Sequence, residues 1–218
     1  MKSKLEILKE NLKVLIELNP KGEYKIGRCL SSKEIELFES RHNIKLPKEY
    51  IEFVTEIGSF GFGPNEGFLP LSQYNDLRHR LIENDLSVEF PFTEKKEDDE
   101  LYGYEYDSLM NGAILVSDCG CGDFEILIVN GTEYGNVWGD YRVSCNGMKP
   151  LLNTNNERLT FLDWYNLFIL KKIEYYENYD PQKIENMIKE LESKRTSIPE
   201  IKDKKSNSIT NFFKSLFK

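Results

Sequence analysis

The segment that most constrains the fold of this chain is residues 115–138, LVSDCGCGDFEILIVNGTEYGNVW. An apolar run rich in β-branched residues at 124–129 follows a shorter apolar stretch around Val116. Apolar runs of this length, bounded by glycines, are typical of buried strands joined by turns. The segment predicts two or three antiparallel strands, at about 113–117, 124–130 and 136–144, with Trp138 in the core. The glycines that separate them are Gly120, Gly122, Gly131 and Gly135.

Helical periodicity appears on both sides of this segment. Ser31 is followed three residues later by Glu34, which is the spacing of a capping box. Pro47 stands where a first helical turn tolerates proline, and Gly58 stands where that helix would end. The spacing of apolar residues predicts helices over 3–17, 31–41, 47–57 and 72–83, a short strand at 67–71, and further helices from Phe161 and from Pro181.

The chain is acidic, with a net charge of −8 over 218 residues. Residues 201–218 hold five lysines and one aspartate, so taking away this +4 leaves −12 for the first 200 residues. Binding to a phosphate backbone needs Lys and Arg, so nucleic acid is not an expected partner. Acidity favours a basic protein partner, and it also serves solubility alone, so both interpretations stay open.

No segment indicates export or membrane insertion. The amphipathic N-terminus carries charges throughout, and no apolar run approaches the length needed to span a bilayer. We therefore expect a cytoplasmic protein with reduced thiols and no stable membrane insertion. Residues 1–196 are expected to form one domain. Residues 197–218 are expected to form a basic tail, flexible or amphipathic, around Phe212, Phe213, Leu216 and Phe217.

The candidate chemical groups are few. Cys119 and Cys121 are separated by one residue, too close for the usual zinc pair. Cys145 would be a third ligand, and no fourth is obvious. Asp118, Asp123 and Glu125 are open to three interpretations, namely an active site, a partner-facing acidic edge, or turn formers. The glycine-rich loop at 59–70 has no lysine and is not followed by a phosphate-binding helix. We expect no metal, no cofactor and no catalytic residue.

Two separated patterns, the second followed by an aromatic helix, then resemble one known family. They are EIELFESRHNIKLPKEYIEFVTEIGSFGFG with a following GFLPL, then GCGDFEILIVNGTEYGNVW, which is followed by the aromatic FLDWYNLFI. In this order they resemble the SUKH superfamily of Smi/Knr-type domains, over about residues 28–175. The resemblance implies an α+β fold whose mixed or mostly antiparallel sheet is flanked by helices. An N-terminal helix and a C-terminal helical extension are added here.

The resemblance also implies a function. Bacterial members are mostly immunity proteins that bind and neutralise a cognate polymorphic or contact-dependent toxin, often a nuclease or deaminase. The alternative is a non-enzymatic regulatory or scaffolding module of the kind that controls cell-wall synthesis. A third reading is an enzyme built on Cys119, Cys121 and the adjacent acids. Homo-oligomerisation stays open.

Most positions that match the family pattern are expected to determine the fold rather than the partner. They are Leu46, Pro47, Gly58, Gly67, Gly120, Gly122, Gly131, Gly135 and Trp138. The segment 81–110, called the insertion below, is rich in acids and tyrosines and departs from that pattern. An acidic face would suit the basic groove of a nuclease toxin. The predicted partner-binding residues are Glu97, Asp98, Asp99, Glu100, Glu105, Asp107, Asp118 and Asp123.

Overall fold

In the computed structural model, which describes residues 2–76 and 81–178, capping boxes fix the start of the first two helices. Helix α1 (Lys4–Leu18) begins after Ser3, and α2 (Ser32–His42) begins after Ser31. In each, the serine hydroxyl accepts from the N–H of the glutamate three residues on, whose carboxylate accepts from the serine N–H. Helix α3 (Lys48–Glu56) follows Pro47 directly. All three helices lie where the sequence predicted them.

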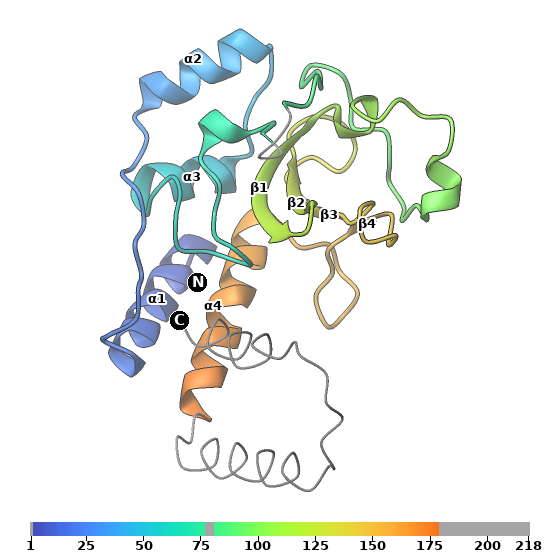
Figure 1. Ribbon diagram of the computed structural model, residues 1–218. Coiled ribbons are helices and arrows are strands. Elements are labelled where there is room, and N and C mark those ends of the chain that lie inside the picture. Colours follow the sequence, from blue (N-terminus) through green and yellow to red (C-terminus); the bar gives the residue numbers. More distant parts are fainter. Residues whose placement is uncertain (1, 77–80, 179–218) are drawn as a thin grey trace, which may run out of the picture. The chain divides into compact units, whose positions relative to one another are not determined.

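The described strands form one antiparallel sheet in the order β1-β2-β3-β4. They are β1 (Ala113–Gly120), β2 (Asp123–Ile128), β3 (Val137–Asp140) and β4 (Met148–Pro150) (Figure 1). A two-residue turn joins β1 to β2, and both of its residues, Cys121 and Gly122, have positive φ angles of 55° and 91°. This turn matches the right-handed twist of a hairpin. The expected α+β class with an antiparallel sheet is confirmed, and β4 is a strand that the sequence did not reveal.

The segment before β1 covers the edge of the sheet instead of forming the expected elements. Phe68 bridges to Ser117, and Leu69 N–H donates to the Val116 carbonyl at 2.9 Å. Further on, Leu115 N–H donates to the Tyr74 carbonyl at 2.8 Å. The predicted strand at 67–71 is therefore an isolated bridge. The predicted helix at 72–83 was wrong for its described part, which has only the 3-10 turn η1 (Leu71–Gln73), because extended pairing with β1 competes with it.

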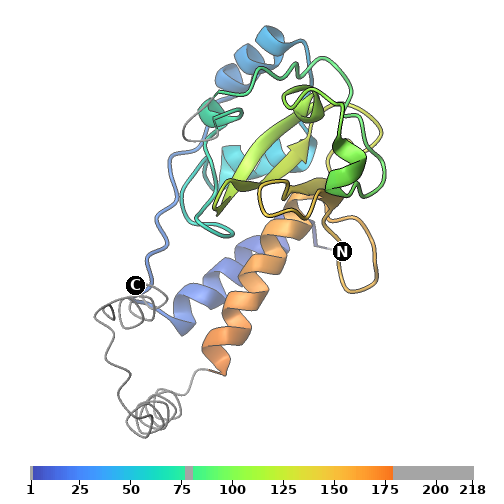
Figure 2. The same ribbon diagram turned by 45° about the vertical axis from the view of Figure 1, so that its right-hand side comes forward.

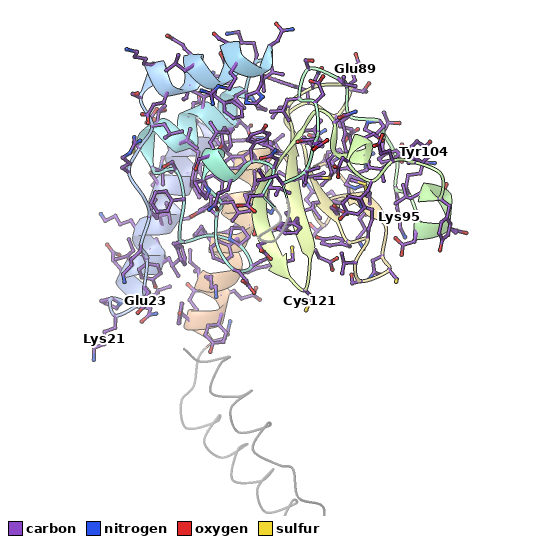
Figure 3. The ribbon with its side chains drawn as sticks, turned by 45° about the horizontal axis from the view of Figure 1, so that its top comes forward. Lys21, Glu23, Glu89, Lys95, Tyr104 and Cys121 are labelled. Atoms are coloured by element: carbon purple, nitrogen blue, oxygen red, sulfur yellow. The ribbon has the colours of Figure 1, made fainter. Side chains whose placement is uncertain are left out.

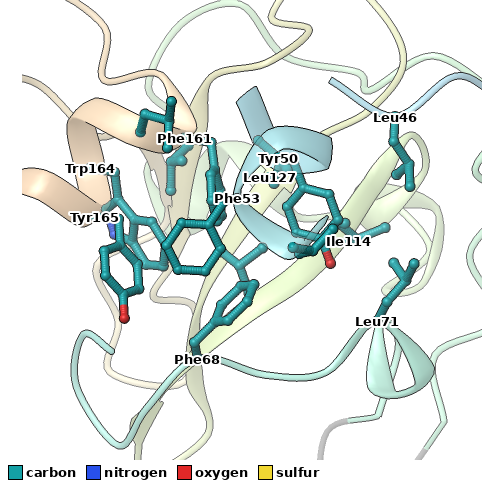
Figure 4. Close-up of a cluster of buried hydrophobic side chains, with 14 of the residues drawn as sticks. Leu46, Tyr50, Phe53, Phe68, Leu71, Ile114, Leu127, Phe161, Trp164 and Tyr165 are labelled. Carbon is teal, nitrogen blue, oxygen red and sulfur yellow. The ribbon is translucent and has the colours of Figure 1, made fainter. Parts of the chain in front are cut away.

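One face of the sheet packs against helices. Phe53 of α3 is fully buried at its centre, with its ring centroid 5.3 Å from Phe68, 5.4 Å from Phe161 and 4.5 Å from Tyr165 (Figure 4). Strand residues such as Ile114 complete this core. Such edge-to-face and tilted ring pairs add to the gain from apolar burial. Leu46, which matches the family pattern, is also buried in this core, so its side chain serves packing.

Helix α4 (Phe161–Glu177) supplies the aromatic side of this core, as the sequence predicted, and lies beside α1 (Figure 2). Asn11 donates to the side-chain oxygen of Asn166 at 2.8 Å, and Lys4 pairs with Asp163 at 2.6 Å. The first helix and the last described helix thus pack together. The helix expected after Pro181, the boundary at residue 196 and the basic tail lie outside the described residues.

Glycine is required where the chain passes close to itself at Gly67. Its φ angle is 119°, and a Cβ built there would lie 2.6 Å from the Gly61 carbonyl oxygen. A side chain at this position would clash with the backbone of the bridge that pairs Gly61 with Phe68. A residue with a side chain at position 67 would therefore be strained.

Truncation of Phe53 tests the centre of the helical core. We expect Phe53→Ala to lower the free energy of unfolding by about 3–5 kcal/mol, because it removes a buried ring and leaves a cavity. Urea denaturation followed by circular dichroism measures this. Leu37→Ala, on the exposed side of α2 with 58% of Leu37 accessible, should change stability by less than about 0.5 kcal/mol. Equal losses in the two variants would contradict the placement of Phe53.

Candidate protein-interaction surface

The insertion covers the face of the sheet opposite the helical core. Its buried apolar side chains pack against Leu115, Ile126 and Trp138 to form a second hydrophobic cluster. The Trp138 side chain is fully buried, and its indole N–H donates to Glu133 at 3.0 Å. The predicted core position of Trp138 is confirmed. The side chains that the insertion contributes are Ile82, Phe90, Phe92, Leu101, Leu109 and Met110.

Backbone pairing fixes the acidic part of the insertion to the edge strand. Lys96 and Met148 exchange two hydrogen bonds of 2.8 and 2.9 Å, and Asp98 accepts from Gly147 N–H at 3.1 Å. Gly147 has a φ angle of 63°, and a Cβ there would lie 1.9 Å from the Lys96 carbonyl oxygen. No side chain fits at that point, so glycine is what allows the insertion to approach β4.

Two arginines tie the insertion to the rest of the sheet. Arg142 pairs with both oxygens of Asp140, at 2.6 and 2.7 Å, and donates to the Tyr106 carbonyl at 3.2 Å. Its guanidinium carbon lies 4.0 Å from the centre of the Tyr106 ring. Arg158 pairs with Glu133 and donates to the Thr93 carbonyl at 2.7 Å. These charge-assisted contacts hold the surface of the insertion in one conformation.

Four of the predicted partner-binding acids are exposed on this surface: Glu97, Asp99, Glu100 and Glu105. Glu97 and Glu100 form a reciprocal capping box around the 3-10 turn η2 (Asp98–Leu101). Lysines lie beside them, since Lys95 pairs with Glu97 and Lys96 pairs with Glu100 at 3.0 Å. Figure 3 shows Lys95 and Tyr104 at the outer side of the insertion. The charge here is thus partly balanced within the insertion.

Asp98 and Asp107 are half-buried, and each carboxylate accepts a backbone hydrogen bond. Asp98 accepts from Gly147, and Asp107 accepts from Glu83 N–H at 3.2 Å. Both residues lie in the insertion, where their charge adds to that of the exposed acids. Their local contacts also give them a part in holding the loop.

Asp118 and Asp123 lie elsewhere, at the base of the β1–β2 turn, and are only 3% and 9% exposed. Asp118 accepts from Gly120 N–H at 2.7 Å, and Asp123 accepts from Ser144 N–H at 3.2 Å. Buried acids with such contacts stabilise turns, so this geometry favours their alternative interpretation as turn formers. The structure does not bring them together with the exposed acids of the insertion.

Two tyrosines of the same surface were not among the predicted binding residues. Tyr102 is 84% exposed and Tyr104 is 53% exposed, between Glu100 and Glu105. Tyr102 and Tyr104 lie in a turn. Gly103, whose φ angle is 95°, is the signal that could have indicated it. Exposed tyrosines on a fixed backbone suit protein interfaces because they bury a large area with few rotatable bonds.

The cysteine pair offers little chemistry. Burial, followed by nearby carboxylates, raises the pKa of the Cys119 thiol to about 12, so the thiolate is scarce at neutral pH. Cys121 is exposed at the tip of the β1–β2 turn (Figure 3). Within residues 2–76 and 81–178, no group of three or more His, Cys, Asp or Glu side chains is placed to hold a metal ion. In the same part of the chain, no helix is both long and apolar enough to cross a membrane.

Comparison with known proteins places this architecture in a family. Residues 29–157, more than half of the chain, match the SMI1 / KNR4 family (SUKH-1). The chain belongs to the SMI1/KNR4 family. No curated protein and no solved structure matches the chain. SUKH-1 is a family of immunity proteins in polymorphic toxin systems, and its proteins are generally non-catalytic. The match includes α2, α3, the sheet and the insertion, while α1 and α4 lie outside it.

In this SMI1/KNR4 domain, Glu125 joins three distant segments of the chain. Its carboxylate is 9% exposed and accepts from Asn65 at 2.6 Å and from the Trp164 indole at 3.1 Å. Burial raises the pKa of Glu125 above its ordinary value of 4.5, although both hydrogen bonds act in the opposite direction. The folded protein therefore binds a proton at this site more tightly than the unfolded chain does.

The stability of the protein should depend on pH through Glu125. Above about pH 4.5 the unfolded chain loses this proton before the folded protein does, so the free energy of unfolding falls as pH rises towards the folded pKa. We expect Glu125→Gln to remove that decline, as measured by urea denaturation at a series of pH values.

Glu34→Gln is the control, because the Arg28 contact lowers the pKa of Glu34 to about 2. The stability that Glu34 contributes is instead lost as pH falls below 4.5. An unchanged slope in Glu125→Gln would contradict the assignment.

Proposed function

We propose that this protein is the immunity protein of a bacterial polymorphic or contact-dependent toxin system. It acts in the cytoplasm by binding a cognate toxin domain directly and blocking it. Membership of the SMI1/KNR4 family supports the class of function. The surface of the insertion supports direct binding, because it presents exposed acids and tyrosines on a backbone fixed by Arg142, Arg158 and Gly147.

The single observation that carries the proposal is this preorganised surface. Ordering a loop on binding costs free energy, and a loop that is already fixed avoids most of that cost. Tyr102 can supply buried contact area, and the acids around it can attract a basic partner. A nuclease toxin is the favoured partner class, since its substrate groove must be basic to hold a phosphate backbone.

Co-expression tests the function. The toxin domain encoded beside this gene should arrest growth alone, and co-expression with this protein should restore growth and yield a co-purifying complex. Rescue without a complex would contradict direct binding. Absence of rescue would contradict immunity and favour the regulatory or scaffolding alternative. Unchanged protection by a Cys119→Ser/Cys121→Ser double variant would remove the remaining enzymatic reading.

Neutralising the exposed acids tests the role of the insertion. We expect the combined variant Glu97→Gln, Asp99→Asn, Glu100→Gln and Glu105→Gln to slow association with the toxin by about tenfold at low salt, since electrostatic attraction speeds encounter. Surface plasmon resonance at low and high salt measures this difference, which should shrink as salt rises.

A matched control separates position from net charge. Glu10, Glu17, Glu23 and Glu36 are exposed and lie outside the insertion, so changing all four to Gln removes the same charge elsewhere. This control should slow association less than the insertion variant does. Equal slowing by the two variants would show that net charge acts without the insertion, and would contradict its predicted role.

A further inference from the structure

The two family-like sequence patterns meet at an open groove whose lining residues all lie outside the insertion. The groove has a volume of about 550 Å³, with Glu39 and Lys45 from the end of α2 and its following turn on one side. Asn130 and Tyr134, from the loop after β2, lie on the other side. Just beyond it, a Cβ built on Gly135 would lie 3.9 Å from Pro47 Cβ. Segments about ninety residues apart in the sequence thus form one recess.

A carboxylate is buried in this groove. Glu39 is only 7% exposed, and its Oε1 accepts from Leu46 N–H at 2.9 Å. That bond fixes the side chain at the junction between α2 and α3. The other oxygen, Oε2, accepts from Lys45 Nζ at 2.6 Å. A buried acid is costly unless a cation or donors satisfy it, so the second contact matters.

The cation that meets Glu39 comes from a side chain that lies mostly in solvent. The Lys45 side chain is 81% exposed, so its long stem gains little packing and its ammonium group keeps most of its hydration. Holding this long, exposed side chain in one position costs entropy, which offsets part of its attraction to the buried carboxylate of Glu39. A cation brought by a partner and shielded from water by that partner would compete effectively for the same oxygen.

Tyr134 gives the groove an aromatic wall. The residue is 45% exposed, and burial followed by the charge of Glu39 raises the pKa of its hydroxyl, which therefore stays neutral. A neutral ring beside a carboxylate suits a guanidinium group, which pairs with the oxygen and stacks on the aromatic face. Arginine thus fits this pair of groups better than an ammonium ion does.

We propose that the groove receives an arginine side chain of the protein partner, which displaces Lys45 from Glu39 and packs against Tyr134. In identifying the partner as the toxin domain, this inference rests on the proposed function. The site lies outside the insertion, so the toxin contacts the protein at two places. Lys45 occupies the groove until the partner binds.

A small-molecule probe tests the groove without the toxin. N-acetyl-arginine methylamide, titrated into the full chain and followed by NMR, should shift signals of Glu39, Lys45 and Tyr134, while N-acetyl-norleucine methylamide should not. Lys45→Ala should bind the probe about two- to fivefold more tightly, because it removes the competitor. Glu39→Gln should bind it at least about tenfold more weakly, although its amide oxygen still accepts from Leu46.

Two controls match these changes in charge. Lys48 is 88% exposed and pairs with Glu52 at 3.5 Å outside the groove, so Lys48→Ala should leave probe binding unchanged. Glu36→Gln is the charge-matched control for Glu39→Gln, because Glu36 is exposed on α2, and it should leave probe binding unchanged. Equal effects of Lys45→Ala and Lys48→Ala, or no binding of the arginine probe, would overturn the proposal. Lys45→Ala removes a side chain that packs little and leaves the Leu46 contact of Glu39 in place, so it tests the groove even if Glu39→Gln does not fold.

The same variants in complex with the toxin domain separate the two proposals. If the unchanged protein binds the toxin, Lys45→Ala should tighten the complex and Glu39→Gln should weaken it, in the order seen with the probe. Toxin binding that neither variant alters would overturn the groove proposal and leave the proposed function standing. Absence of toxin binding by the unchanged protein would overturn the proposed function, while the probe titration would still decide whether the groove binds arginine.

Discussion

Strands β1 and β2 are buried on both faces, and the rest of the described structure follows from that constraint. Nearly every residue of the two strands is buried, including those that alternate to opposite sides. Antiparallel sheets often leave one face to water, but this one requires a cover on each side. Helices α1, α3 and α4 supply one cover, and the insertion supplies the other. The insertion is therefore a structural layer of the domain as well as a surface.

Each of the two proposed contact sites rests on a part of the structure that also contributes to a hydrophobic core. The acids of the insertion rest on a layer that is anchored through Arg142 and Gly147. The groove around Glu39 lies at the junction of α2 and α3. Residues just after this junction, such as Leu46 and Tyr50, are buried in the helical core. Neither site has to be ordered by a partner. Rigid sites of this kind bind with little loss of conformational entropy.

Local sequence signals predicted the elements that depend on local interactions. Capping boxes at Ser31 and helical spacing around Phe161 indicated helices, and the glycine-bounded run at 124–129 indicated the hairpin. The elements that failed depend on distant partners. Tyr74 pairs with Leu115 of β1 instead of continuing a helix, and β4 is a three-residue strand whose edge is paired with Lys96. Pairing between distant segments leaves no periodic pattern to read.

The candidate sites show the same difference between features that the local sequence predicts and features that depend on distant segments. Charge patterning located the acids of the insertion, but charge alone did not reveal that Asp118 and Asp123 are buried at turns. The exposure of Tyr102 became visible only with the fold, although Gly103 already marked a turn. Glu39 looked like any other acid of α2 in the sequence. Its contacts are with Leu46 N–H and Lys45, in the segment that joins α2 to α3. The spacing of apolar residues along α2 does not predict contacts with that segment.

The buried and the exposed side chains of the insertion serve different purposes, although they alternate within one short stretch of chain. Inward residues such as Phe92 and Leu101 complete a hydrophobic core, while outward neighbours such as Asp99 and Tyr102 contribute little to it. Substitutions at exposed positions usually change stability only slightly. The outer residues are thus free to diversify over evolutionary time while the inner ones preserve the fold. Under the proposed function, a lineage can change its toxin partner without having to rebuild the domain.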